Sequence, residues 1–268
     1  MKLASTILFL CVLVVVAAAQ PITITGDPSY NSDSPYNRLY NTRSVFTFSG
    51  TVVGTETAPP MKGMGNAVTM LVKDKGGTTW HVDVGPQWYV VNQRTQIKVK
   101  DRVKVTGSKV QIDGSPVVLA EQIVHAKNVL ALRRPAGRPY WDAVYSEAPV
   151  DDGINHRQIS GTITNIDVFN DGTNGPTQRV TIHTDEGDFL VALAPTWYVQ
   201  HQRALAQLAV GPYVDINLFA PDGVPIQPYM PGNPAPPIVF ARSIGYGNQW
   251  AVLRSVNGVP MWYGIGGN

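Results

Sequence analysis

The sequence predicts an all-β protein made of two tandem small barrels, each of about five strands with a short helix after the third strand. Two observations predict it: an internal repeat, and short segments rich in β-branched residues, separated by turns, in each copy. The 268 residues suit one large domain or two of ordinary size. With 15% charged and 44% apolar residues, the chain is neither a disordered charged tail nor collagen-like.

The repeat consists of five ordered matches. They pair residues 49–52 with 160–163, 85–90 with 194–199, 93–94 with 202–203, 120–123 with 241–244, and 132–141 with 253–262. The offset drifts from 109 to 121, so the copies differ by loop insertions. One insertion is the Pro- and Gly-rich stretch 221–237. Two domains follow, at 44–141 and 158–263, joined by a linker at 142–157 and preceded by an extended or disordered arm at 20–43.

The first residues read as a secretory signal peptide, at 1–19. Lys2 supplies the positive start, an apolar run follows, and three alanines offer a cleavage site before Gln20. A membrane anchor is the alternative, and the run is at the short limit for spanning. After cleavage no transmembrane segment is expected. The single cysteine, Cys11, leaves with the signal, so the mature chain is expected to lack thiols and disulfides. We therefore expect a secreted or periplasmic protein.

The first copy shows the element order most clearly. Strands are expected at 44–57, 67–73 and 78–84, a short helix at 87–96, and strands at 98–110 and 116–125 around a turn at Asp113-Gly114. This is the order of the OB-fold. Another small barrel or sandwich with a similar strand count is the alternative.

Several motifs carry a resemblance to a known family. They are SGT, GPxWYV, DxVxVTGS, an AxxI strand and LR…GxPxW, and the second copy departs from them at Ala194 and at 211–220. The chain resembles secreted bacterial OB-fold (BOF-like) domains over both copies. The resemblance implies a non-enzymatic binding or envelope role and offers no catalytic residues.

A basic strand is the sharpest candidate site. Alternation over 97–105 would place four cations on one strand face, flanked by two more: Lys98, Lys100, Arg102 and Lys104, with Arg94 and Lys109. The first domain has 13 Lys+Arg against 6 Asp+Glu, a net charge of +7, and the second has 4 against 7, a net charge of −3. Such a face would bind a polyanion. The alternative is a solvated strand face that discourages edge pairing.

Two weaker candidates involve aromatic and thioether side chains. The repeated pairs Trp88-Tyr89 and Trp197-Tyr198 could stack nucleobases, but their presence in both copies favours a structural role. Met61 and Met64 are weak candidates for a copper(I) site. We otherwise expect no metal and no cofactor.

The sequence offers no catalytic constellation, because nucleophile motifs, phosphate loops and paired histidines are lacking. The expected function is an exported, non-catalytic binding protein whose basic first domain binds nucleic acid or an acidic polysaccharide. The alternatives are a structural or assembly protein of the bacterial envelope, with self-association between basic and acidic domains, and a copper-handling accessory protein.

Overall fold

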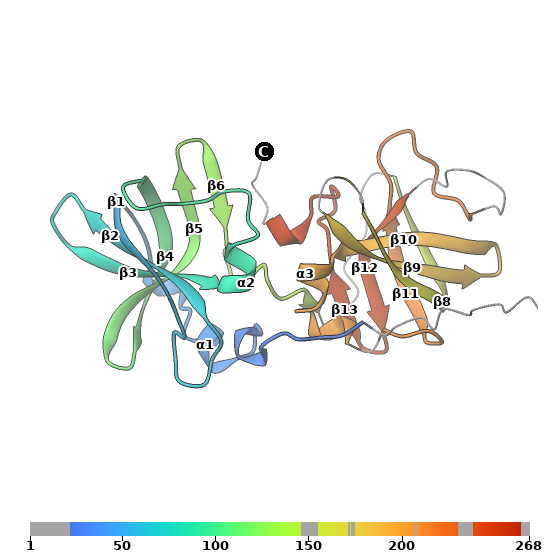
Figure 1. The fold of residues 1–268 in the computed structure, drawn as a ribbon, viewed down its shortest axis with the longest axis horizontal. Coiled ribbons are helices and arrows are strands. Elements are labelled where there is room, and N and C mark those ends of the chain that lie inside the picture. The colour runs from blue at the N-terminus through green and yellow to red at the C-terminus, as the bar shows by residue number, and fades with distance from the viewer. Residues whose placement is uncertain are drawn as a thin grey trace, which may run out of the picture.

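Two barrels lie one beyond the other along the long axis of the molecule (Figure 1). A computed structural model of the chain describes residues 22–145, 155–170, 172, 175–206, 208–229 and 238–263. The expected signal peptide, 1–19, lies outside the described residues, and so does the middle of the expected linker. Among the residues that are described, no helix has the length and apolar character needed to cross a membrane.

The first barrel is a closed sheet. It consists of β1 (Val45–Ala58), β2 (Ala67–Asp74), β3 (Thr79–Pro86), β4 (Arg102–Ile112) and β5 (Ser115–His125), with α2 (Gln87–Val90) after β3 and β6 (Asn128–Ala131) beside β5. The strand order is β3-β2-β1-β4-β5, and a parallel pairing of β3 with β5 closes the barrel. Every second residue points inward, so β-branched side chains such as Val52, Val72 and Val105 fill the interior. The predicted OB-like barrel is confirmed.

The second barrel repeats this topology. Its elements are β8 (His156–Asn170), β9 (Pro176–Thr184), β10 (Gly187–Pro195), α3 (Thr196–Val199), η3 (Arg203–Leu205), β11 (Tyr213–Phe219), β12 (Val239–Tyr246), β13 (Gln249–Val252) and η4 (Met261–Tyr263). The order is β10-β9-β8-β11-β12, closed by parallel pairing of β10 with β12. Part of the segment expected to be a linker forms β7 (Val144–Tyr145), which pairs with β13.

Two expected elements of the first copy are shorter than predicted. The helix expected at 87–96 ends at Val90. The strand expected at 98–110 begins only at Arg102, because a turn precedes it. In that turn Lys100 has a φ of 81°, and the Asp101 carboxylate accepts the Lys98 N–H at 2.8 Å. The prediction that Lys98 and Lys100 lie on a strand is therefore wrong.

The segment before the first barrel is packed, in contrast to the expected extended or disordered arm. From residue 22 it runs through η1 (Pro28–Tyr30), α1 (Pro35–Arg38) and η2 (Thr42–Ser44). Tyr30 and Tyr36 are buried, and the Trp141 indole N–H donates to the Tyr30 carbonyl at 3.0 Å. Composition pointed to disorder, but two buried aromatic rings provide the apolar area that orders the segment.

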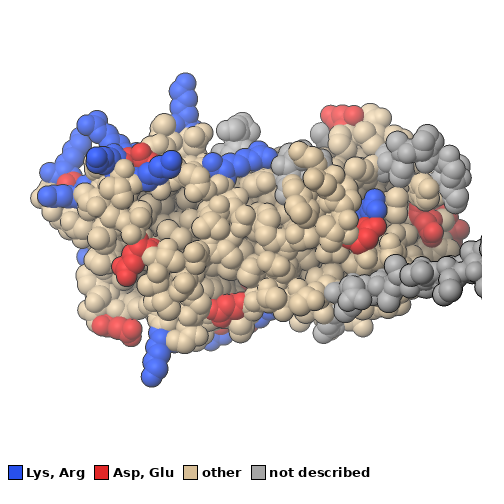
Figure 2. All heavy atoms as spheres, in the orientation of Figure 1, with Lys and Arg blue, Asp and Glu red and all other residues tan. Residues whose placement is uncertain are grey.

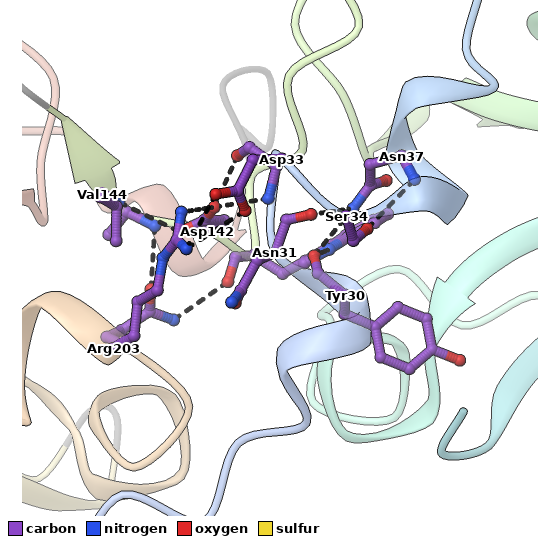
Figure 3. Close-up of polar contacts among 12 residues, drawn as sticks. Tyr30, Asn31, Asp33, Ser34, Asn37, Asp142, Val144 and Arg203 are labelled. Atoms are coloured by element: carbon purple, nitrogen blue, oxygen red, sulfur yellow. Dashed lines mark hydrogen bonds and ion pairs between the residues drawn. The ribbon is translucent and has the colours of Figure 1, made fainter. Parts of the chain in front are cut away.

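The same arm connects the two barrels through a polar network (Figure 3). The buried Asp142 carboxylate accepts both the N–H and the hydroxyl of Ser32, at 2.7 and 2.6 Å. Arg203 of the second barrel reaches Asp33 at 3.1 Å and Asp142 at 3.8 Å. Upstream, the Thr25 N–H donates to the Gln200 carbonyl at 2.8 Å. The arm therefore lies against both barrels.

The barrels meet at their helix ends (Figure 1). Two equivalent glutamines make reciprocal contacts there. Gln93 of the first barrel donates to the Trp262 carbonyl at 2.8 Å, and Gln202 of the second donates to the Trp141 carbonyl at 3.1 Å. Gln202 also accepts the Ala143 N–H at 2.9 Å. Both glutamines are buried, so these bonds replace water for groups that have no access to it.

This arrangement predicts a large stability loss on removing one glutamine. Gln202→Leu keeps the volume but leaves the Ala143 N–H and the Trp141 carbonyl buried without a partner. We expect the free energy of unfolding to fall by about 3 kcal/mol in urea denaturation, since each unpaired buried group costs about 1–3 kcal/mol. The exposed Gln87 is the matched control, and Gln87→Leu should change stability by less than about 0.5 kcal/mol. Equal effects of the two substitutions would contradict the proposed role of the contact.

Candidate binding face of the first barrel

Cations from the two strands that flank β1 lie on the outer side of the first barrel. Thr51 of β1 pairs with Lys73 of β2 on one side and with Arg102 of β4 on the other. Residues opposite one another in antiparallel strands share a face. Lys104 follows on the same face, opposite Ser49. Because β1 separates β2 from β4, Lys73 and Arg102 lie two strand spacings apart, roughly 10 Å between backbones, and long side chains on this face form one patch.

The patch lines a shallow groove. The groove has a volume of about 530 Å³ and is lined by residues of β1, β2, β4 and the β2–β3 turn, including the cations Lys73, Lys75, Arg102 and Lys104. We call these four residues the basic face. The one acid that lines the groove, Asp74, accepts the Trp80 indole N–H at 2.8 Å and the Thr78 N–H at 2.9 Å. Figure 2 shows Lys and Arg side chains gathered at the end of the first barrel far from the second.

The six cations predicted from the sequence do not all lie on this face. Arg102 and Lys104 are on it, whereas Lys98 and Lys100 lie in the turn before β4. The Arg94 guanidinium lies 4.3 Å from the centre of the Tyr263 ring, at the contact between the barrels. The Lys109 ammonium lies 5.3 Å from the centre of the Trp80 ring.

Sequence reasoning missed Lys73 and Lys75. They belong to the β2–β3 hairpin, and only the register of β2 against β1 brings them beside β4. The Lys-Asp-Lys-Gly-Gly run at 73–77 does read as a charged hairpin turn, which would have been the available signal.

The second barrel does not carry this face. In its strand register, the positions of Lys73 and Arg102 are taken by His183 and Tyr213, both opposite Thr162. The position of Lys104 is taken by Asp215, since Lys104 lies opposite Ser49 and Asp215 opposite Ser160. In the turn that follows, Asp185 comes two residues after His183, as Lys75 comes two residues after Lys73. Ser160 donates to Asp215 at 2.5 Å, which further occupies that carboxylate. Two barrels of one topology thus differ in charge at four matched surface positions, so the fold does not require the cations.

The repeated aromatic pairs lie between the barrels. The ring centres of Trp88 and Trp197 are 6.4 Å apart, and Trp88 stacks on His201 at 3.9 Å with an interplanar angle of 7°. Tyr89 and Tyr198 are buried. Burial lowers the pKa of His201 to about 4, so its ring is neutral near pH 7. These aromatic rings pack the interface of the two barrels.

The two methionines lie in the β1–β2 connection. The Met64 N–H donates to the Met61 carbonyl at 3.2 Å, which closes a turn. Nowhere in the described ranges do three or more His, Cys, Asp or Glu residues come together as metal ligands. The copper site stays a prediction.

A buried charged pair under the arm was also missed. Asp83 in β3 is 2% exposed, and Arg133 is equally buried. The Arg133 guanidinium donates to the Asn37 side-chain oxygen at 3.2 Å and to the Ala120 carbonyl at 2.6 Å. Desolvation raises the pKa of Asp83 to about 6, and Arg133 opposes the rise. A lone acid in a strand gives no sequence signal that an arm will cover it.

Comparison with known proteins was made for family and fold. Residues 44–130 and 155–220 match the profile of the MamS/MamX magnetosome protein family. No curated protein matches the chain. The expected OB-like fold is present, but the matching family is not the secreted bacterial OB-fold (BOF-like) family expected from the sequence, and export stays a prediction.

Several solved structures are similar at low identity. The wild-type single-stranded DNA binding protein from Thermus aquaticus is 12% identical over 76% of this chain and 91% of that chain, with a TM-score of 0.23. The tetrameric p202 HIN2 is 7% identical over 79% and 90%, with a TM-score of 0.23. The Ifi202 HINa domain, in complex with 20bp dsDNA, is 10% identical over 77% and 94%, with a TM-score of 0.22.

The raised pKa of Asp83 predicts a specific pH dependence of stability. Its carboxyl binds a proton more tightly in the folded state than in the unfolded chain, where the pKa is about 3.9. Stability from this group is therefore present at about pH 4 and is lost as the pH rises to about 6, on the order of 3 kcal/mol.

Asp83→Asn should remove this loss of stability with rising pH. The measurement is the free energy of unfolding in urea from pH 4 to 7. Asp113→Asn, at an exposed turn position with a φ of 49°, is the matched control and should leave the decline in place. An unchanged pH profile in Asp83→Asn would contradict the prediction.

Proposed function

Since the chain belongs to the MamS/MamX magnetosome protein family, we propose that it is an exported, non-catalytic member whose first barrel binds a polyanion through the basic face. Nucleic acid and acidic polysaccharide are the two polymer classes expected. The observation that carries the proposal is the convergence of Lys73, Lys75, Arg102 and Lys104 on one groove, with none of the four present at the matched positions of the second barrel.

Electrostatics supports this role. Cations on β2 and β4, roughly 10 Å apart across β1, can contact successive charges of one polymer. The net charge of +7 over 44–141, against −3 over 158–263, directs a polyanion to the first barrel. The groove is shallow and lined by β-strands, which suits an extended polymer better than a small molecule.

Assembly of copies is the second candidate function. The positions that carry Arg102 and Lys104 in the first barrel carry Tyr213 and Asp215 in the second, so the basic face of one copy complements the acidic surface of another. Such contacts would support an envelope or organelle-surface assembly with a protein partner. Mass measurement in low salt distinguishes this candidate, because it requires oligomers that dissociate as salt rises.

The polyanion proposal predicts salt-dependent binding by the basic face. Fluorescence anisotropy with labelled single-stranded DNA, and separately with a labelled acidic polysaccharide, should give micromolar dissociation constants in low salt. Engagement of four cations gives a slope of log K against log salt of about −3 for a single strand.

The double variant Arg102→Tyr with Lys104→Asp should lower the affinity at least tenfold and halve that slope. It introduces the residues that the second barrel already has at these positions, so folding is expected to be retained. The control is Arg38→Tyr with Lys62→Asp, two exposed cations outside the groove with the same change of charge. Equal losses in both variants would reject the basic face as the site, and absence of binding in low salt would reject the function.

A further inference from the structure

Each barrel has an end directed away from the other barrel, between the β2–β3 turn and the β4–β5 connection or their counterparts (Figure 1). In the second barrel this end is closed by its own chain. Phe189 there is fully buried, and the segment 224–229, part of the long β11–β12 connection, lies over that end. Val224 and Ile226 of the segment pack against the core.

The covering segment is held mainly by its backbone. The Tyr229 N–H donates to the Asp188 carbonyl at 2.6 Å, in an antiparallel bridge at the edge of β10. Arg157 donates to the Ile226 carbonyl at 3.3 Å. Pro228 lies so close to Gly187 that a Cβ there would be 3.1 Å from the proline Cβ. An extended, proline-containing peptide is therefore the occupant that this barrel end accommodates.

The same end of the first barrel has no such segment. Its β4–β5 connection is the two-residue turn Asp113-Gly114. Strand register places Trp80 at the position of Phe189 and Phe46 at the position of Arg157. Phe46, Phe48 and Trp80 are only partly buried, and their ring centres lie 5.2–5.4 Å apart. They adjoin a groove of about 440 Å³ rimmed by Arg43 and Lys109.

The strand edge at this end is also available. The Asp74 N–H donates to the Thr78 carbonyl at 2.9 Å, so these two residues form a hydrogen-bonded pair. In antiparallel strands the next pair is not hydrogen-bonded, and the N–H and carbonyl groups of Thr79 therefore point away from β2. Thr79 is equivalent to Asp188 of the second barrel, whose carbonyl accepts the hydrogen bond from Tyr229 of the covering segment. The pairing of β3 with β5 begins only at Val82. Thr79 is exposed.

We propose that the open end of the first barrel docks an extended, acidic, proline-containing segment of a partner protein. The edge at Thr79 would bridge the backbone of that segment as Asp188 bridges Tyr229, and the three aromatic rings would pack its prolines. Arg43 and Lys109 give this end a positive rim, whereas the position of Lys109 in the second barrel is the buried Ala220, so an acidic segment is favoured. The groove shares no lining residue with that of the basic face, although the Trp80 indole N–H donates to Asp74 of the neighbouring groove, and the proposal stands without the polyanion function.

The test uses the segment that the structure already shows in such a site. A synthetic peptide with the sequence of residues 222–229, DGVPIQPY, is titrated into the protein while the indole N–H signal of Trp80 is followed by NMR. We expect a saturable shift with a dissociation constant of roughly 1 mM, because a free linear peptide loses the effective concentration that its tether provides in the second barrel.

Two variants make the result specific. Lys109→Glu, at the exposed rim, should weaken binding at least fivefold, and Lys62→Glu, an exposed lysine in the β1–β2 connection, should leave it unchanged. Phe46→Arg introduces the residue of the second barrel and should also weaken binding by removing one ring. The same peptide with both prolines replaced by glycine should bind at least fivefold more weakly.

Three outcomes would overturn the proposal. The first is no shift of the Trp80 indole signal at several millimolar peptide. The second is equal binding by the Lys109→Glu and Lys62→Glu proteins. The third is a shift of the same signal by a short oligothymidylate under conditions where the peptide gives none, which would assign the aromatic cluster to nucleobase stacking instead.

Discussion

The reciprocal bonds from Gln93 and Gln202 to the tryptophan carbonyls of the opposite barrel fix the arrangement of the whole molecule. Each tryptophan is also anchored in its own barrel by an arginine, since Arg133 lies 4.7 Å from the ring centre of Trp141 and Arg254 lies 4.8 Å from that of Trp262. The two barrels therefore share one buried polar interface.

Fixing the helix ends leaves the outer surfaces and far ends of the barrels free to diverge. Because the barrel is duplicated, many surface positions of one barrel have a counterpart in the other. Differences in charge or exposure between counterparts show which surface features the fold itself does not require. Cations on the outer face of β2 and β4 correspond to acids or neutral residues in the second barrel. The far end that is covered in the second barrel exposes Trp80 and its neighbours in the first. A fold shared by both copies cannot explain either difference, so both point to what the first barrel contacts.

Much of the fold was predictable because the repeat and the β-branched segments are local signals. The strand bounds agree within a few residues, apart from β4, where the positive φ of Lys100 interrupts an alternating pattern. The basic face was only half predictable: Arg102 and Lys104 share a strand, but Lys73 joins them through register, which depends on long-range pairing. The order of the arm follows from burial of Tyr30 and Tyr36, with distant partners such as Trp141 and Arg133, which composition does not encode.

The path of the arm also decides how the molecule could be held. The first described residues run along the second barrel near Gln200, whereas Tyr263, the last described residue, lies against Arg94 at the contact between the barrels. Figure 1 shows these last described residues between the two barrels. A tether or fusion joined beyond Tyr263 would therefore hold the protein near its middle. The basic face and the aromatic end of the first barrel would project to one side, clear of the attachment point.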